Sequence, residues 1–250
     1  MQQDAALSRI HQSWLARSER RMLTWLAANM PAWVTPDRLT MLGLFGALLA
    51  GLSYVGTAYS PRMLLLACFG LVLNWFGDSL DGSLARYRGI ERPRYGFFVD
   101  HSADVVSQIL IFFGLGLSAY MRFDMALLAL LSYWLAALYT FIRAVATRVF
   151  QISYLGVGPT EIRLGLVLYT LALPLMNALV IETPIGRMAP IDDIVLVTFC
   201  AVLVLFVVSV YGEGRRLAAL EPQPARKGRP QPLHGDQLRP LRGGQPEQAD

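Results

Sequence analysis

Six apolar segments, each about as long as a membrane-spanning helix, dominate this sequence of 250 residues. A helix needs roughly 20 apolar residues to cross the ~30 Å hydrocarbon core of a bilayer. Hydrophobic residues make up 54% of the chain, which is more than in an ordinary soluble domain. The sequence therefore predicts an all-α integral membrane bundle of six transmembrane helices, over residues 39–59, 63–85, 97–120, 124–149, 162–181 and 191–211.

The segments that flank this six-span domain, residues 35–212, are predicted to differ from it. Residues 10–34, within an N-terminal segment 1–34, have apolar and basic residues on opposite faces of a helix. This pattern favours an amphipathic helix lying in the membrane interface, with a solvated leader helix as the alternative. Residues 213–250 are rich in Pro, Gly, Gln and Arg, and are predicted to form a disordered basic tail.

The basic residues are distributed very unevenly between the two predicted sides of the membrane. With six spans, 19 of the 22 Lys and Arg residues lie on the side that holds both termini, and only Arg62, Arg122 and Arg187 lie on the other. An excess of Lys and Arg marks the cytoplasmic side. We therefore expect a multi-pass protein of the plasma (inner) membrane with both termini cytoplasmic. Because the basic residues follow the predicted topology, the net charge of +4 does not indicate a nucleic-acid-binding protein.

Four aspartates stand close to the connection between the second and third predicted spans. Asp78 and Asp81 are three residues apart, and Asp100 and Asp104 are four apart. On a helix, each pair leaves roughly the same face, one turn apart. A basic connection of about ten residues would make the two helices antiparallel neighbours. The four carboxylates are therefore predicted to converge near the cytoplasmic end of this helical hairpin.

Four converging carboxylates repel one another unless cations neutralise them. Hard divalent ions, Mg²⁺ above all, bind a few carboxylates together with substrate phosphates. Gly82 can admit phosphates close to the backbone, and Arg86 can neutralise a diphosphate. Gly96 is expected to permit a close helix contact. Aspartates that only pair with the neighbouring arginines are the alternative interpretation.

The segment from Asp78 to Asp104 reads D-x2-D-G-x2-A-R-x9-G-x3-D-x3-D. This pattern resembles the signature of the CDP-alcohol phosphotransferase family, with every fixed position present. The resemblance covers about residues 35–212, including the six-span layout. It implies an enzyme of phospholipid biosynthesis that moves a substituted phosphate group from a CDP-alcohol to an acceptor hydroxyl and releases CMP.

The resemblance also implies a role for individual residues. Two divalent ions, Mg²⁺ or Mn²⁺, would be bound by the aspartates of the motif, and one of these aspartates, Asp104, would also be the general base. The nucleotide site would be lined by residues of the motif and by one residue before the first span. The metal ligands are thus Asp78, Asp81, Asp100 and Asp104, and the nucleotide-binding residues are Asp78, Asp81, Gly82, Ala85, Arg86 and Thr40.

The donor and the acceptor are less well specified by the sequence. The resemblance allows either CDP-diacylglycerol with a polar alcohol or a CDP-aminoalcohol with a lipid alcohol. His101 and the pair Glu161 and Arg163 resemble positions of choline and ethanolamine phosphotransferases. Arg143 and Arg148 can bind a phosphorylated acceptor or extend to lipid phosphates. We also predict a homodimer that binds membrane lipids and no nucleic acid.

Two other classes of membrane protein fit less well. An intramembrane prenyltransferase also binds Mg²⁺-diphosphate through aspartates, but we would expect two aspartate-rich motifs on separate helices. A transporter or divalent-cation channel would need a polar pathway across the bilayer. The outer halves of the predicted spans are nearly all apolar.

Overall fold

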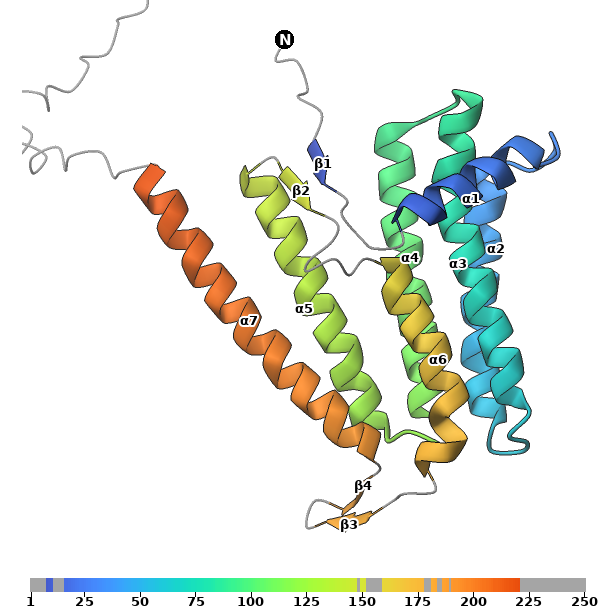
Figure 1. Cartoon of the computed structure of the whole chain (residues 1–250), viewed down its shortest axis with the longest axis vertical. Helices are drawn as coiled ribbons and strands as arrows, with labels where there is room; N and C mark the ends of the chain where they lie inside the picture. Colours follow the sequence, from blue (N-terminus) through green and yellow to red (C-terminus); the bar gives the residue numbers. More distant parts are fainter. Residues whose placement is uncertain are drawn as a thin grey trace, which may run out of the picture. The chain divides into compact units, whose positions relative to one another are not determined.

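The computed structural model describes residues 8–10, 16–147, 149–151, 159–177, 181–183, 186–188 and 190–220. Its helices are α1 (Ala16–Asn29), α2 (Pro36–Gly56), α3 (Met63–Arg88), α4 (Pro93–Gly116), α5 (Phe123–Thr147), α6 (Pro159–Asn177) and α7 (Pro190–Leu220) (Figure 1). The elements up to Ser209 form one compact unit, and the last turns of α7, from Val210, belong to a second.

Four strands of three residues each accompany the helices in the described part of the chain. β1 (Ser8–Ile10) pairs in parallel with β2 (Val149–Gln151), and β3 (Ile181–Thr183) pairs antiparallel with β4 (Gly186–Met188). The sequence analysis did not anticipate these short pairings. They lie outside the long helices, so the architecture remains helical, as predicted.

Five of the described helices are long and apolar enough to cross a membrane: α2, α3, α4, α5 and the part of α7 from Asp192 onward. They correspond to five of the six predicted spans. The remaining predicted span, residues 162–181, falls on α6. This helix is 19 residues long, has charged residues in its first turns and contains Pro174. The count of six spans therefore stays a prediction.

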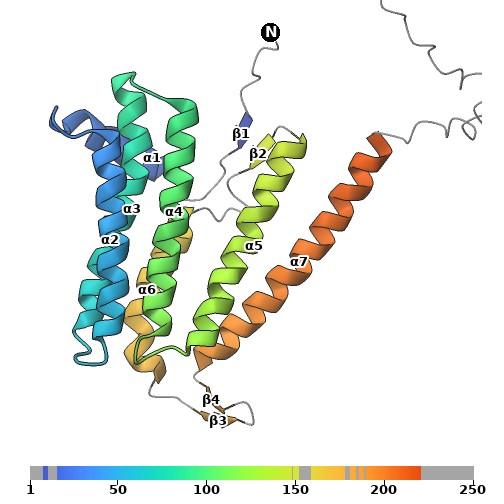
Figure 2. The same cartoon turned by 180° about the vertical axis from the view of Figure 1, so that it is seen from behind.

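The N-terminal helix α1 packs against α3 through one apolar face. Leu23 and Ala27 are buried in a cluster that also contains Leu80 and Leu84 of α3. Trp25, by contrast, is 64% exposed. Figure 2 shows α1 running across the neighbouring helices rather than along them. A helix is thus present within the predicted segment 10–34, although residues 11–15 lie outside the described residues. Its location in the membrane interface stays a prediction.

Local sequence signals fix the ends of the helices that carry the aspartates. Thr35 caps the N-terminus of α2 by accepting a hydrogen bond from the Arg38 backbone N–H, and Pro36 occupies the first turn. Helix α3 ends at Gly89, whose φ of 64° is left-handed. Pro93 then begins α4, so that only four residues join the two helices. The predicted helical hairpin is therefore present.

Glycines bring α2, α3 and α4 into backbone contact. A methyl group at Gly77 of α3 would overlap the backbone of Gly43 on α2, and one at Gly114 of α4 would overlap Gly51. Gly46 and Gly70 meet the opposite helix in the same way. Small residues allow this close approach in membrane helices, where lipid provides no hydrophobic drive for association.

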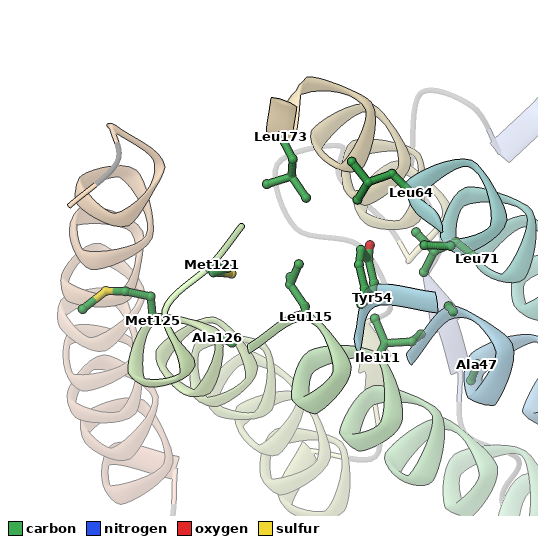
Figure 3. Packing of buried hydrophobic residues seen from close by; sticks show 12 residues of the cluster. Ala47, Tyr54, Leu64, Leu71, Ile111, Leu115, Met121, Met125, Ala126 and Leu173 are labelled. Carbon is green, nitrogen blue, oxygen red and sulfur yellow. The ribbon is translucent and has the colours of Figure 1, made fainter. Parts of the chain in front are cut away.

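A hydrophobic cluster surrounds several of these glycine contacts, in the part of the helices away from the motif aspartates. Figure 3 shows Tyr54 of α2 among Leu71, Ile111 and Leu115, which come from α3 and α4. The Tyr54 hydroxyl forms a buried hydrogen bond of 2.6 Å with the Thr170 hydroxyl of α6. This contact ties α6 to the three-helix core.

Two details of the sequence analysis are wrong. Residues 213–220, assigned to the disordered tail, are helical because α7 continues to Leu220; the rest of the predicted tail lies outside the described residues. Gly96 does not mediate a close helix contact, because no atom lies within 4 Å of the position that its Cβ would take.

Candidate active site

Three of the four motif aspartates converge between α3 and α4. One carboxylate oxygen from each of Asp78, Asp100 and Asp104 can be chosen so that all lie within 4.8 Å of one another. Asp78 comes from the second half of α3, and the other two come from the first half of α4. The antiparallel hairpin thus brings together side chains that are up to 26 positions apart in the sequence.

The fourth aspartate, Asp81, points toward α2 instead. Its Oδ2 accepts a hydrogen bond of 2.6 Å from the Thr40 hydroxyl, and its Oδ1 accepts one of 2.5 Å from the Gly82 backbone N–H. Asp81 is buried, with 8% of its surface exposed. It therefore lies beside the three-carboxylate cluster and is held by its own hydrogen bonds.

Arg163 of α6 reaches into the carboxylate cluster. Its guanidinium donates to Asp78 Oδ2 at 2.5 Å and to Asp104 Oδ1 at 3.2 Å. The sequence analysis placed this arginine among the residues that select donor or acceptor, and it missed the contact with the aspartates. An arginine near the start of a largely apolar helix was the available signal.

A small pocket opens beside the cluster, on the side that faces α2. Its lining combines Asp78 and Asp104 with polar residues one turn farther into the helices, Asn74 and Ser107. The Asn74 side-chain amide donates to the Gly43 carbonyl at 3.0 Å and to the Ser107 hydroxyl at 3.3 Å. The remaining lining residues are Thr40, Gly43, Leu44 and Ala103.

The predicted nucleotide-binding residues Gly82, Ala85 and Arg86 lie on the last turns of α3. The Arg86 guanidinium lies so close to Gly82 that a side chain at position 82 would touch it. It also donates a hydrogen bond of 3.2 Å to the Ser83 hydroxyl. Arg86 is exposed and Ala85 half-buried. A diphosphate at this surface would meet an exposed guanidinium and a helix turn without bulky side chains.

His101 lies next to the cluster in an aromatic setting. Its Nδ1 is 3.3 Å from Asp100 Oδ2, and its ring stacks on Phe97 with centroids 4.2 Å apart. Phe141 of α5 meets the His101 ring edge-on at 5.2 Å. The imidazole is therefore held in a fixed orientation beside a predicted metal ligand.

The other predicted selection residues are only partly described. Arg143 is half-buried near the end of α5, and Glu161 is half-buried in the first turn of α6. Arg148 lies outside the described residues. Of the predicted selection residues, Arg163 contacts Asp78 and Asp104, and His101 contacts Asp100.

The donor set fits a hard divalent cation. Asp78, Asp100 and Asp104 offer only carboxylate oxygens, which Mg²⁺ and Mn²⁺ prefer. Among the described residues, these three form the one group of at least three His, Cys, Asp or Glu side chains close enough to hold an ion.

Comparison with known proteins supports the assignment that the motif suggested. The family model for CDP-alcohol phosphatidyltransferases matches residues 29–209, which is most of the chain and includes all four aspartates. The chain belongs to this family. It is accordingly a multi-pass membrane protein, and the family consists of transferases of phospholipid biosynthesis.

Two curated relatives show how broad the family is. An archaetidylinositol phosphate synthase from Pyrococcus horikoshii is 32% identical over 104 residues, which cover 42% of this chain and 52% of the relative. Cholinephosphotransferase 1 from Xenopus laevis is 33% identical over 104 residues, which cover 39% of this chain and 25% of the relative. The matches thus span about half the length of the first relative and a quarter of the second.

Proposed function

We propose that this protein transfers a substituted phosphate group from a CDP-alcohol to an acceptor hydroxyl and releases CMP, in a reaction that depends on divalent metal ions. The observation that carries the proposal is the convergence of Asp78, Asp100 and Asp104 between α3 and α4. Family membership supports the reaction class, and the carboxylate cluster supports the dependence on metal.

Each motif residue has a proposed role in this reaction. Asp78, Asp81 and Asp100 hold two metal ions, and Asp104, which also faces the metal site, takes the proton from the acceptor hydroxyl. Metal ions held by these residues would supply positive charge that offsets the negative charge of the phosphates during transfer. Gly82, Ala85 and Arg86 form the surface for CDP, with Thr40 fixing the orientation of Asp81 from α2.

The identity of the alcohol is the open part of the proposal. The relatives' names refer to inositol phosphate in one case and to choline phosphate transfer in the other. His101, Arg143, Glu161 and Arg163 are the residues that we propose select the donor or the acceptor. Arg148 belongs to the same proposed set.

Release of CMP from the purified protein tests this function. The protein in lipid nanodiscs is supplied with Mg²⁺ or Mn²⁺ and, in separate reactions, with CDP-diacylglycerol or with CDP-choline and CDP-ethanolamine. The acceptors are polar alcohols, with and without a phosphate, for the first donor and diacylglycerol for the others. We expect CMP release with one donor class and none in EDTA. Full turnover in EDTA would refute the dependence on metal, and no release with any donor would refute the transferase.

We also propose that α6 crosses the membrane and so brings the number of spans to six. With six spans, both termini lie on the same side, which we propose is the cytoplasmic side of the plasma membrane. The 19-to-3 distribution of basic residues supports this orientation. The proposed organisation is an N-terminal interfacial segment over residues 1–34 and a transferase domain over 35–212. Reporter fusions at the two termini should give the same cytoplasmic signal. Sedimentation in detergent tests the predicted homodimer.

A further inference from the structure

The guanidinium of Arg163 lies among the negatively charged carboxylates of the motif. It bridges Asp78 and Asp104, two members of the three-carboxylate cluster, from a third helix. The exposed fractions of the three side chains are 20%, 21% and 29%. Charges in such a sheltered site interact more strongly than on a solvated surface.

Arg163 and a metal ion would compete for the same carboxylate oxygens. A guanidinium uses lone pairs of Asp78 Oδ2 and Asp104 Oδ1, and a divalent ion bound by these residues requires lone pairs on the same groups. A fixed positive charge a few ångströms from the ions would also repel them. Arginine stays protonated under all ordinary conditions, so the protein cannot remove this charge by losing a proton.

We propose that Arg163 is an internal counter-cation, which holds the carboxylate cluster together before metal binds and is displaced from Asp78 and Asp104 when divalent ions bind. This inference rests on the proposed metal-dependent function. Its consequence is a competition: the ion pairs stabilise the metal-free protein, and the same ion pairs weaken the apparent affinity for metal.

The anchoring of α6 indicates that the Arg163 side chain, not the helix, makes this movement. At the start of α6, the Thr160 hydroxyl donates to Glu19 of α1 at 2.5 Å. Two turns beyond Arg163, Thr170 is hydrogen-bonded to Tyr54 of α2. Contacts on both sides of Arg163 hold the helix against the core. A long arginine side chain can change rotamer while its helix stays in place.

Metal binding to the full chain, measured without substrate, tests the proposal. Mn²⁺ is titrated into the protein in nanodiscs, and bound Mn²⁺ is followed by electron paramagnetic resonance. The variants are Arg163→Gln, which removes the charge, and Arg163→Lys, which keeps the charge but lacks the planar guanidinium that can contact two carboxylates at once. Arg92→Gln is the matched control, because Arg92 pairs with Asp37 at 2.7 Å, away from the cluster.

We expect Mn²⁺ to bind roughly tenfold more tightly to Arg163→Gln than to the wild type, since one opposing charge has been removed. Arg163→Lys should fall between them, and Arg92→Gln should match the wild type. In EDTA, Arg163→Gln should unfold at a lower temperature than the wild type, and Mn²⁺ should raise its unfolding temperature by more. This reversal, a less stable apo protein with better metal binding, is the signature of a displaced counter-cation.

Equal or weaker Mn²⁺ binding by Arg163→Gln, with binding by the wild type intact, overturns this inference and leaves the proposed function standing. Binding of Mn²⁺ by neither protein overturns the metal-dependent function and the inference together. If Arg163→Gln is not recovered in folded form, Arg163→Lys decides the question by itself. Tighter binding than in the wild type supports the competition, and unchanged or weaker binding refutes it.

Discussion

Thr40 on α2 donates a hydrogen bond of 2.6 Å to Asp81 on α3, across 41 positions of sequence. The bond turns the Asp81 carboxylate toward α2 and away from the three clustered aspartates. Two helices thus cooperate in orienting one motif residue. This relationship leads to the first prediction.

Replacing Thr40 by valine keeps the shape of the side chain and removes the hydroxyl. A hydrogen bond to a charged group contributes about 1.5–3 kcal/mol, so we expect kcat/KM for CMP release to fall by roughly 10- to 100-fold. Thr40→Ser should keep most of the activity because it retains the donor. Unchanged activity in Thr40→Val, together with a loss in Thr40→Ser, would show that packing of the threonine methyl group, not the hydrogen bond, is what matters.

The proposed general base can be separated from the other motif aspartates. Asp104→Asn should lower turnover by about 10²–10⁴-fold, as expected for loss of a general base. Mg²⁺-dependent binding of CDP should survive better in this variant than in Asp81→Asn or Asp78→Asn. Calorimetry with CDP makes the comparison. If Asp104→Asn loses CDP affinity as severely as Asp81→Asn, Asp104 acts mainly as a metal ligand, and the base must be sought elsewhere.

The glycine contacts between α2 and α3 should tolerate no added methyl group. In Gly77→Ala the new Cβ would overlap backbone atoms of Gly43 and Leu39, and overpacking of this kind costs about 1–3 kcal/mol or more. We expect a lower unfolding temperature and a reduced yield of folded protein. Gly165→Ala on α6 is the control, since its Cβ would meet no atom within 4 Å. Similar stability of the two variants would contradict the close helix contact.

Arg88 should hold the connection between α1 and α2 in place. Its guanidinium donates to three backbone carbonyls, those of Met30, Pro31 and Val34, at 3.0, 2.8 and 2.5 Å. We expect Arg88→Gln to increase hydrogen exchange in residues 16–34 by at least tenfold, because hydrogen bonds from charged donors contribute about 1.5–3 kcal/mol each.

The control for Arg88 is again Arg92→Gln, which breaks a solvent-exposed ion pair that contributes little to stability. Exchange in residues 16–34 should hardly change in this variant. Protection that is the same in Arg88→Gln as in the wild type would mean that other contacts, such as the buried ones of Leu23 and Ala27, are sufficient to hold α1.

The helical hairpin that carries the aspartates could be predicted from local sequence because its determinants are local. Apolar length gave the helices, while the short connection and the spacing of Asp100 and Asp104 placed the carboxylates. The separation of Asp78 from Asp81 was less obvious. Three residues turn a helix by about 300°, so their side chains differ in direction by about 60°. That difference is enough for Asp78 to face α4 and α6 while Asp81 faces α2.

The ion pairs of Arg163 could not be predicted from spacing. Arg163 lies 85 positions from Asp78 and 59 from Asp104, and only the packing of α6 against α3 brings them together. The glycine contacts between α2, α3 and α4 depend in the same way on how whole helices cross. Sequence periodicity describes one helix at a time, so it does not report which faces of different helices meet.

The glycine contacts also determine which parts of the protein can open. Where backbones touch, no side chain is available to change rotamer and absorb a displacement, so α2, α3 and α4 should move as one body. Thr40, Asp81 and the three clustered aspartates all belong to that body. On the proposed function, a lipid substrate from the bilayer would have to pass where helices meet through flexible side chains, beside α5. The half of the site that α2 to α4 carry would keep its geometry while the lipid enters and leaves.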